Sequence, residues 1–290
     1  MNNHMPVRKV IFSSLLAFSA FSFAEQFERE NEWLEQAKQG DSGAMYELAQ
    51  QYCEVGDYQQ SLYWQEKYVN TKNAYNPSFE KIKLARAYEM GHCDPYNKGT
   101  NSPPMFSPDY YKVIEWYQKV IYADKSTDSN TISAKFRLAE IYRWGKGGIA
   151  QDGALAKRYY EDIANLDDQV IEKDIAKNEK EIFFKLKNFS PIREARGNAR
   201  YRLAQMYYFG KFARQDDRLA YQWAYKALED NNFSAPIIVA VMQYQGRGVT
   251  QDKVKATNLM GVVCETGWSQ QACDWYQDMR DNRPLRAGNL

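Results

Sequence analysis

The chain has 290 residues, with 38 basic and 37 acidic side chains and a formal net charge of +1. This length leaves room for one large or two ordinary domains with a proper hydrophobic core. Because 44% of the residues are apolar and 26% are charged, the composition excludes a disordered, a collagen-like or a membrane-bundle chain. The near-neutral charge excludes the globally basic surface of a nucleic-acid-binding protein, although not a local basic patch. Aromatic residues are unusually abundant at 15%, whereas there are two histidines, and this contrast directs the search for function.

The N-terminal residues have the pattern of a secretory signal peptide. Arg8 and Lys9 precede an uncharged, largely apolar run from Val10 to Ala24, with small residues at positions −3 and −1 of a cleavage site. A membrane anchor is the alternative, but this run is shorter than the ~20 residues needed to span a bilayer. We expect cleavage of residues 1–24, a periplasmic (or secreted) protein and no membrane span. Loss of Arg8 and Lys9 leaves one basic residue fewer than the 37 acidic residues, a net charge of −1.

Histidine is scarce, which removes several classes of enzyme. Without His4, the mature chain keeps His92 alone, so a metal site that needs two histidines cannot be built. A Ser-His-Asp or Cys-His system would have to use His92, whose flanking Gly91 and Pro95 indicate a plain loop position. The phosphate-binding loop, the nucleophile elbow and the His-Glu-x-x-His motif are also absent from the sequence. We therefore expect no catalytic residue, no metal and no cofactor.

Four cysteines are present, at Cys53, Cys93, Cys264 and Cys273. In an exported chain they indicate two disulfides, for which three pairings exist. Cys264 and Cys273 flank a short turn and could join two helices, in which case Cys53 and Cys93 would join the first two repeats. A zinc site with four thiolates is the alternative, but the sequence has no Cys-x-x-Cys pair.

The body of the chain is a repeat with the core pattern Leu-Ala-x-x-Tyr. Each core pattern is followed by an aspartate, by a mostly small residue four positions later, and by a large residue three positions after that. The steps of 36, 54, 65 and 36 residues between core patterns indicate a 36-residue unit with two insertions. The core patterns begin at Leu48, Leu84, Leu138, Leu203 and, in degenerate form, Val239. The aspartates are Asp57, Asp109, Asp152, Asp216 and Asp252, and the last four copies have a glycine at Gly91, Gly145, Gly210 and Gly246.

Each position of the repeat has a structural role. The leucine, alanine and tyrosine share one helical face, and the small alanine allows a neighbouring helix to approach closely. The glycine supplies the left-handed residue that ends the first helix, and the aspartate caps the second. No strand-like alternation of useful length competes with this pattern. The sequence therefore predicts an all-α fold, a right-handed α/α superhelical solenoid of antiparallel helix pairs.

This pattern resembles the Sel-one-like repeat family, a relative of the tetratricopeptide repeat. The family's hallmark is A-x-x-x-L-G-x-x-Y-x-x-G-x-G-V-x-x-D-x-x-x-A-x-x-W/Y. The copy from Ala134 to Tyr159 matches it closely, as does the segment from Gly246 to Asp252. The first two copies are degenerate, as end repeats often are. The resemblance covers about residues 40–268.

Two insertions and a C-terminal cap complete the expected solenoid over residues 25–290. Residues 94–108 are rich in proline, which predicts an irregular loop, either a tolerated surface insertion or a lid. Residues 167–196 predict an amphipathic helix that lengthens a repeat or adds a helix pair; a membrane-surface helix is the alternative. Residues 269–290 would form the cap. The apolar positions of the second insertion are Val170, Ile171, Ile175, Ile182, Phe183 and Leu186.

Positions −1, +2 and +5 from the repeat leucine form one stripe on the first helices, basic in the middle and apolar at its C-terminal end. Position +6 adds Met90, Trp144 and Phe209. The family resemblance implies that first helices line the concave face. Arginine beside tyrosine and tryptophan is the composition of protein-binding hot spots. The alternative is a set of solvated faces with local Arg–Glu pairs, with the cap covering Ile238 and Val241. The candidate partner-binding residues are Lys83, Arg86, Arg137, Arg143, Trp144, Arg202, Tyr208, Phe209 and Tyr244.

Together these patterns predict a non-catalytic protein-binding module. Its partner would be another protein with an acidic, partly apolar surface, and not a nucleic acid. The family resemblance implies, as the favoured role, an immunity protein that binds and neutralises a phospholipase effector of type VI secretion. An envelope or virulence adaptor (or scaffold) is the alternative. A third role is an enzyme, since cysteine-rich relatives are linked to β-lactam binding and hydrolysis, but those carry a disulfide in most repeats.

Overall fold

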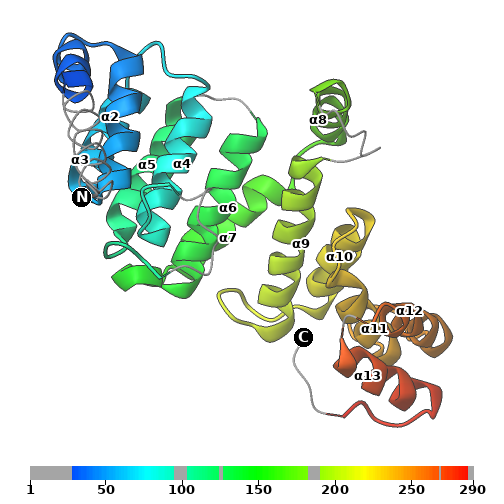
Figure 1. Ribbon diagram of the computed structural model, residues 1–290. Coiled ribbons are helices and arrows are strands. Elements are labelled where there is room, and N and C mark those ends of the chain that lie inside the picture. The colour runs from blue at the N-terminus through cyan, green and yellow to red at the C-terminus, as the bar shows by residue number, and fades with distance from the viewer. Residues whose placement is uncertain (1–27, 95–102, 124–126, 182–189, 268, 287–290) are drawn as a thin grey trace, which may run out of the picture. The chain divides into compact units, whose positions relative to one another are not determined.

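The computed structural model describes residues 28–94, 103–123, 127–181, 190–267 and 269–286 (Figure 1). The expected signal peptide and three apolar residues of the second insertion (Ile182, Phe183 and Leu186) lie outside the described residues. Every regular element in the described part is a helix, so the predicted all-α class is confirmed. No helix of that part combines the length and the apolar character needed to cross a membrane. The chain divides into two compact units, Met1–Val113 and Ile114–Leu290, with the boundary inside α5 (Tyr110–Ala123).

The first unit contains a helix over residues 28–38, followed by α2 (Ser42–Val55), α3 (Tyr58–Val69) and α4 (Pro77–Met90). Helix α3 packs against both α2 and α4. The repeat residues Leu48 and Ala49 of α2 are buried together with Trp64 of α3. The first copy of the repeat therefore forms a helix pair around its own leucine, alanine and tryptophan.

The second unit contains three further helix pairs, built from consecutive helices that contact each other. Its core repeats the same plan, since Leu203 and Ala204, like Leu138 and Ala139, are fully buried. The pairs are α6 (Ser129–Trp144) with α7 (Gly153–Ala164), α9 (Pro191–Phe209) with α10 (Asp217–Glu229), and α11 (Ala235–Gln245) with α12 (Lys253–Glu265). Antiparallel helix pairs are the predicted arrangement; the right-handed sense of the superhelix stays a prediction.

The turn inside each pair of the second unit has the same geometry. Gly145 and Gly210 adopt left-handed φ values of 64° and 67°, which a residue with a Cβ rarely adopts, and end α6 and α9. Asp152 and Asp216 then cap α7 and α10 by accepting a hydrogen bond from the amide three residues further on. The amide of Asp216 also donates to the carbonyl of Tyr207 at 3.1 Å, and equivalent bonds occur in the other glycine-containing turns. The repeat pattern therefore determines the turn as well as the packing.

The second insertion contributes α8 (Asp168–Glu181), which packs against α9. Ile171 of α8 is buried in the same cluster as Ile192 and Leu203 of α9. The described residues of the first insertion, Asp94 and residues 103–108, contain no helix. The carbonyl of Gly91 accepts from the amides of Met105 and Phe106 of this insertion.

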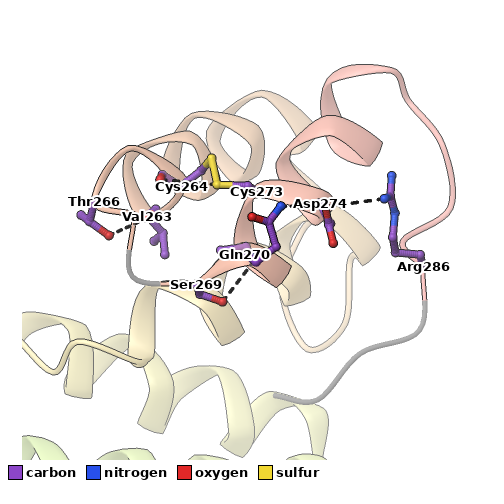
Figure 2. Close-up of a disulfide and its surroundings, with 9 residues drawn as sticks. Val263, Cys264, Thr266, Ser269, Gln270, Cys273, Asp274 and Arg286 are labelled. Atoms are coloured by element: carbon purple, nitrogen blue, oxygen red, sulfur yellow. Dashed lines mark hydrogen bonds and ion pairs between the residues drawn. A yellow bond between two sulfur atoms is a disulfide. The ribbon is translucent and has the colours of Figure 1, made fainter.

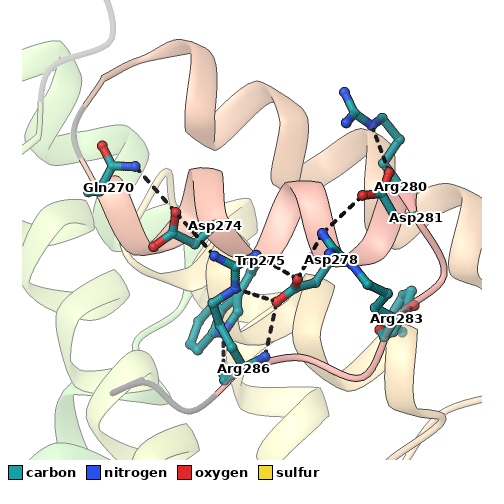
Figure 3. A network of polar contacts seen from close by, with 9 residues as sticks. Gln270, Asp274, Trp275, Asp278, Arg280, Asp281, Arg283 and Arg286 are labelled. Carbon is teal, nitrogen blue, oxygen red and sulfur yellow. Dashed lines mark hydrogen bonds and ion pairs between the residues drawn. The ribbon is translucent and has the colours of Figure 1, made fainter.

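The second unit ends with α13 (Gln270–Arg280) and an irregular segment, residues 281–286. Figure 3 shows Arg286 folded back onto α13, where its guanidinium contacts Asp278 with Nη2 at 2.7 Å. The carbonyl of Arg286 accepts from the indole nitrogen of Trp275 at 2.8 Å. These contacts hold the segment beside α11, with Leu285 packed against the cluster that contains Val241 and Tyr244.

Candidate protein-binding face

The structure joins the cysteines in two pairs. Cys53 of α2 is bonded to Cys93 in the turn after α4, with the two Cα atoms 5.8 Å apart. Cys264 of α12 is bonded to Cys273 of α13, with the Cα atoms 4.6 Å apart (Figure 2). Each disulfide therefore links consecutive parts of the array.

His92 lies next to the first disulfide, in the turn after α4, and is 2% exposed. No group of three or more His, Cys, Asp or Glu side chains that could hold a metal occurs within the described ranges. Most of the candidate partner-binding residues lie elsewhere, on the first helices of the second unit.

A charged network joins α6 to α9. Glu140 of α6 accepts a hydrogen bond from Nε of Arg202 on α9 at 3.0 Å and lies 3.8 Å from Nη1 of Arg143. It also accepts from the hydroxyl of Tyr160 and from the indole nitrogen of Trp144, the latter at 3.1 Å. Gln205 of α9 completes the network, because its Oε1 accepts from Arg143 at 3.1 Å and from Arg202 at 3.2 Å.

The protonation of Glu140 follows from these contacts. Burial raises the pKa of Glu140, but the charge of Arg202 and the hydrogen bonds from Tyr160 and Trp144 outweigh it, so this pKa lies below its ordinary value. Burial and the neighbouring carboxylate raise the pKa of Tyr160. Glu140 is therefore a carboxylate and Tyr160 a neutral donor at neutral pH, which suits a structural network and offers no group poised for proton transfer.

Two large aromatic side chains stand exposed around this network. Trp144, at the last position of α6, is 51% exposed, and Phe209, at the last position of α9, is 54% exposed. The Arg143 guanidinium carbon lies 4.8 Å from the ring centre of Trp144, and the Lys211 ammonium lies 5.7 Å from it. One cation from its own repeat and one from the next repeat therefore lie near the Trp144 ring.

The next step along the array repeats this pairing. Arg247, in the turn after α11, places its guanidinium carbon 4.1 Å from the ring centre of Tyr208 on α9. Its Nη2 atom lies 2.6 Å from Oδ1 of Asp217, and this hydrogen bond lowers the pKa of Asp217. Lys211 and Arg247 occupy the same position of their repeats, directly after the glycine that ends the first helix. Each therefore covers an aromatic ring of the preceding repeat.

We call this surface the arginine–aromatic face. Its five basic side chains outnumber its two acidic ones, so it is cationic as well as aromatic. It has the composition of protein-binding hot spots. It comprises Arg137, Glu140, Arg143, Trp144, Arg202, Gln205, Tyr208, Phe209, Lys211, Asp217 and Arg247.

The candidate residues of the sequence divide into three groups in the structure. Arg137, Arg143, Trp144, Arg202, Tyr208 and Phe209 lie on the arginine–aromatic face. Lys83 and Arg86 lie on α4, in the first unit, which is described separately; a stripe continuous with theirs stays a prediction. The third group is Tyr244 alone.

Tyr244 corrects the expectation of an exposed C-terminal end. It is 6% exposed and is buried with Val241, Trp275 and Met279. Its hydroxyl donates to the carbonyl of Arg283 at 3.0 Å. The segment after α13 therefore occupies the surface that Tyr244 would otherwise offer to a partner. Ile238 is buried as well, against the α9–α10 pair.

Sequence reasoning missed Lys211 and Arg247. The predicted stripe follows helical spacing along the first helices, whereas both cations follow the glycine that ends the helix. A signal was present, because Gly145-Lys146, Gly210-Lys211 and Gly246-Arg247 repeat the same glycine–cation pair.

The Sel1 repeat model matches residues 42–67, 132–168, 197–232 and 238–260. A curated relative from Schizosaccharomyces pombe (strain 972), described as an ERAD-associated E3 ubiquitin-protein ligase component, is 27% identical over 140 residues. These residues are 47% of this chain and 20% of the relative, so the chain spans a small part of that protein.

Solved structures of Sel1 repeat proteins also match the chain. A protective antigen of uropathogenic Escherichia coli strains with an SLR fold is 18% identical, with a TM-score of 0.41 over 88% of this chain and 52% of that one. A Sel1 repeat protein from Oxalobacter formigenes is 20% identical, with a TM-score of 0.36 over 52% of this chain and 92% of that one. One from Klebsiella pneumoniae subsp. pneumoniae is 21% identical, with a TM-score of 0.35 over 87% and 99%.

Proposed function

Because the chain is a Sel1 repeat protein, a kind of protein that typically serves as a protein-interaction module, we propose that it binds a partner protein through the arginine–aromatic face without catalysing a reaction. The partner would present an acidic, partly apolar surface. Exposed Trp144 and Phe209 would supply the apolar anchors, and the surrounding cations would select the acidic partner.

The observation that carries this proposal is the exposure of Trp144 beside two cations. The exposed apolar surface of a tryptophan gains free energy when a partner covers it. Tryptophan and arginine are also enriched among the residues that dominate binding energies. Arg143 and Lys211 lie within 5.7 Å of its ring centre, so a partner that covers Trp144 would also contact these two positive charges.

The favoured role for this binding is immunity. We propose that the protein is exported after cleavage near Ala24 and neutralises a type VI secretion phospholipase effector in the periplasm. Two disulfides in a small array are consistent with an oxidising compartment. An envelope or virulence adaptor would use the same face, and its partner would not be a phospholipase. A β-lactam-binding or β-lactam-hydrolysing enzyme is the less favoured alternative.

Binding can be tested with a triple variant of the face and a double variant as its control. The face variant would carry alanine at Arg137, Trp144 and Lys211. Glu140 would keep its contacts with Arg143, Arg202 and Tyr160. The control would replace Phe233 and Lys255, which are 84% and 77% exposed on other surfaces. We expect the purified phospholipase effector to bind the control and not the face variant, and its lipid hydrolysis to be inhibited by the control alone. Equal inhibition by both variants would show that the arginine–aromatic face is not the binding surface. Binding of a partner that is not a phospholipase would favour the adaptor role.

A further inference from the structure

The C-terminal segment shows how a first helix of this array holds a stretch of irregular chain. Tyr244 of α11 donates its hydroxyl to the backbone carbonyl of Arg283, and Leu285 packs in the cluster of Val241 and Tyr244. One tyrosine hydroxyl thus binds the backbone while the apolar helix face takes a leucine side chain.

In the preceding repeat, the tyrosine at the same position is covered by the side chain of Arg247 and not by a stretch of main chain. Tyr208 lies five residues after the repeat residue Leu203, as Tyr244 lies five residues after Val239. Tyr208 is half-buried, and its neighbour Phe209 contacts it edge to face, with ring centres 5.0 Å apart. The first helices differ in charge, because α11 has no charged residue, whereas α6 carries Arg137 and Arg143 and α9 carries Arg202.

From these two observations we propose that the arginine–aromatic face binds an extended, acidic segment of the partner in the way that α11 binds residues 281–286. This inference rests on the proposed function and specifies its partner. The segment's carboxylates would meet Lys211 and Arg137, which are exposed, and its apolar side chains would lie on Trp144 and Phe209. The Tyr208 hydroxyl would donate a hydrogen bond to a backbone carbonyl of the bound segment. The charge of the face favours acidic segments over the basic stretch that Arg283 and Arg286 place on α11.

The repeat also sets the spacing of the anchors. The pairs Trp144–Lys211 and Tyr208–Arg247 occur one repeat apart along the array. Packed helices such as α6 and α9 lie about 10 Å apart, and an extended chain advances about 3.3 Å per residue. Two acidic–apolar anchors in the segment would therefore be about three residues apart.

Two fluorescein-labelled peptides of identical composition test this inference by fluorescence anisotropy. One carries two Glu-Leu pairs about three residues apart, and the other carries all four residues together at one end. We expect the spaced peptide to bind the wild-type protein at least about tenfold more tightly than the clustered one. Lys211→Glu should lower the affinity for the spaced peptide by a similar factor. Lys255→Glu, a charge reversal on α12, should leave this affinity unchanged.

Tyr208→Phe adds a test of the backbone contact, because it keeps the ring and removes the hydroxyl donor. A loss of affinity for the spaced peptide supports the proposed contact. Equal binding of the two peptides would show non-specific charge attraction and would overturn the inference. If the effector binds through the face but neither peptide does, the extended segment is refuted while the proposed function survives. If the face variants keep full binding to the effector, the proposed function fails, and the inference fails with it.

Discussion

Arg202 on α9 donates a hydrogen bond from Nε to Oε1 of Glu140 on α6 at 3.0 Å, and so bridges two consecutive repeats. The same carboxylate holds Arg143 and Trp144 of its own helix. One acidic side chain therefore determines where three residues of the arginine–aromatic face lie. The two arginines are positioned by the fold, while Arg137 and Lys211 contribute charge without joining the Glu140 network.

Replacement of Glu140 by glutamine should destabilise the second unit. The amide cannot compensate the charges of Arg143 and Arg202, which are held close together by Gln205. Because hydrogen bonds to charged groups contribute about 1.5–3 kcal/mol, we expect the free energy of unfolding to fall by about that amount in urea titrations. Asp162→Asn is the control, since Asp162 forms an ion pair with Lys135 that is more exposed and should cost less than about 1 kcal/mol. Equal losses would show that the network is no stronger than a surface pair.

Glu140 should also affect the pH dependence of stability. Because the pKa of Glu140 in the folded protein lies below the ordinary 4.5, the folded state holds the carboxylate more strongly than the unfolded state does. This contribution is complete above the ordinary pKa and is lost as the pH falls through the folded value. We expect the difference in unfolding free energy between wild type and Glu140→Gln to shrink below about pH 4.5. A difference that stays constant from pH 7 into this acidic range would contradict this.

Asp278 should produce a separate acid transition at the C-terminal cap. Hydrogen bonds from the side chain and backbone of Arg286 lower the pKa of Asp278 from 3.8 to about 2. The stabilisation is therefore present above pH 3.8 and disappears as the pH falls towards 2 (Figure 3). We expect residues 281–286 to detach in this range, which the fluorescence of Trp275 would report. In Asp278→Asn the same fluorescence should lack this acid step; a step that persists would assign the transition to another group.

Several features were predictable from the sequence because local chemistry determines them. The glycine that ends α9 and the aspartate that caps α10 act within a few residues of their own positions, so the repeat pattern identified the helix pair. The burial of Tyr244 was not predictable in this way, because a segment 39 residues later covers it. The same holds for Glu140, whose partner Arg202 is 62 residues away. Spacing along one helix reveals which residues share a face, but not which other element covers that face.

The two disulfides should differ in their contribution to stability. Cys53–Cys93 closes a separation of 40 residues, and Cys264–Cys273 closes one of 9. In the chain-entropy model, the disulfide that closes the longer loop stabilises the fold by about 4 kcal/mol, and the other by about 2.6 kcal/mol. We expect the Cys53→Ser/Cys93→Ser variant to lose more unfolding free energy than Cys264→Ser/Cys273→Ser in denaturant titrations. The reverse order would mean that local packing outweighs loop closure at these sites.

Gly248 should tolerate no side chain, because its Cα faces the backbone at the start of α10. A Cβ built there would lie 2.0 Å from the carbonyl oxygen of Asp217, the residue that binds Arg247. Gly267 is the matched control, since its φ of +68° equals that of Gly248 within a degree, while nothing lies within 4 Å of its Cβ position. Left-handed backbone alone costs alanine about 1–2 kcal/mol at either site. We therefore expect Gly248→Ala to lower the unfolding free energy clearly more than Gly267→Ala, and to weaken acidic peptides by displacing Arg247. Equal destabilisation by the two substitutions would show that α10 shifts to make room, and that the Asp217–Arg247 pair is not fixed by this close approach.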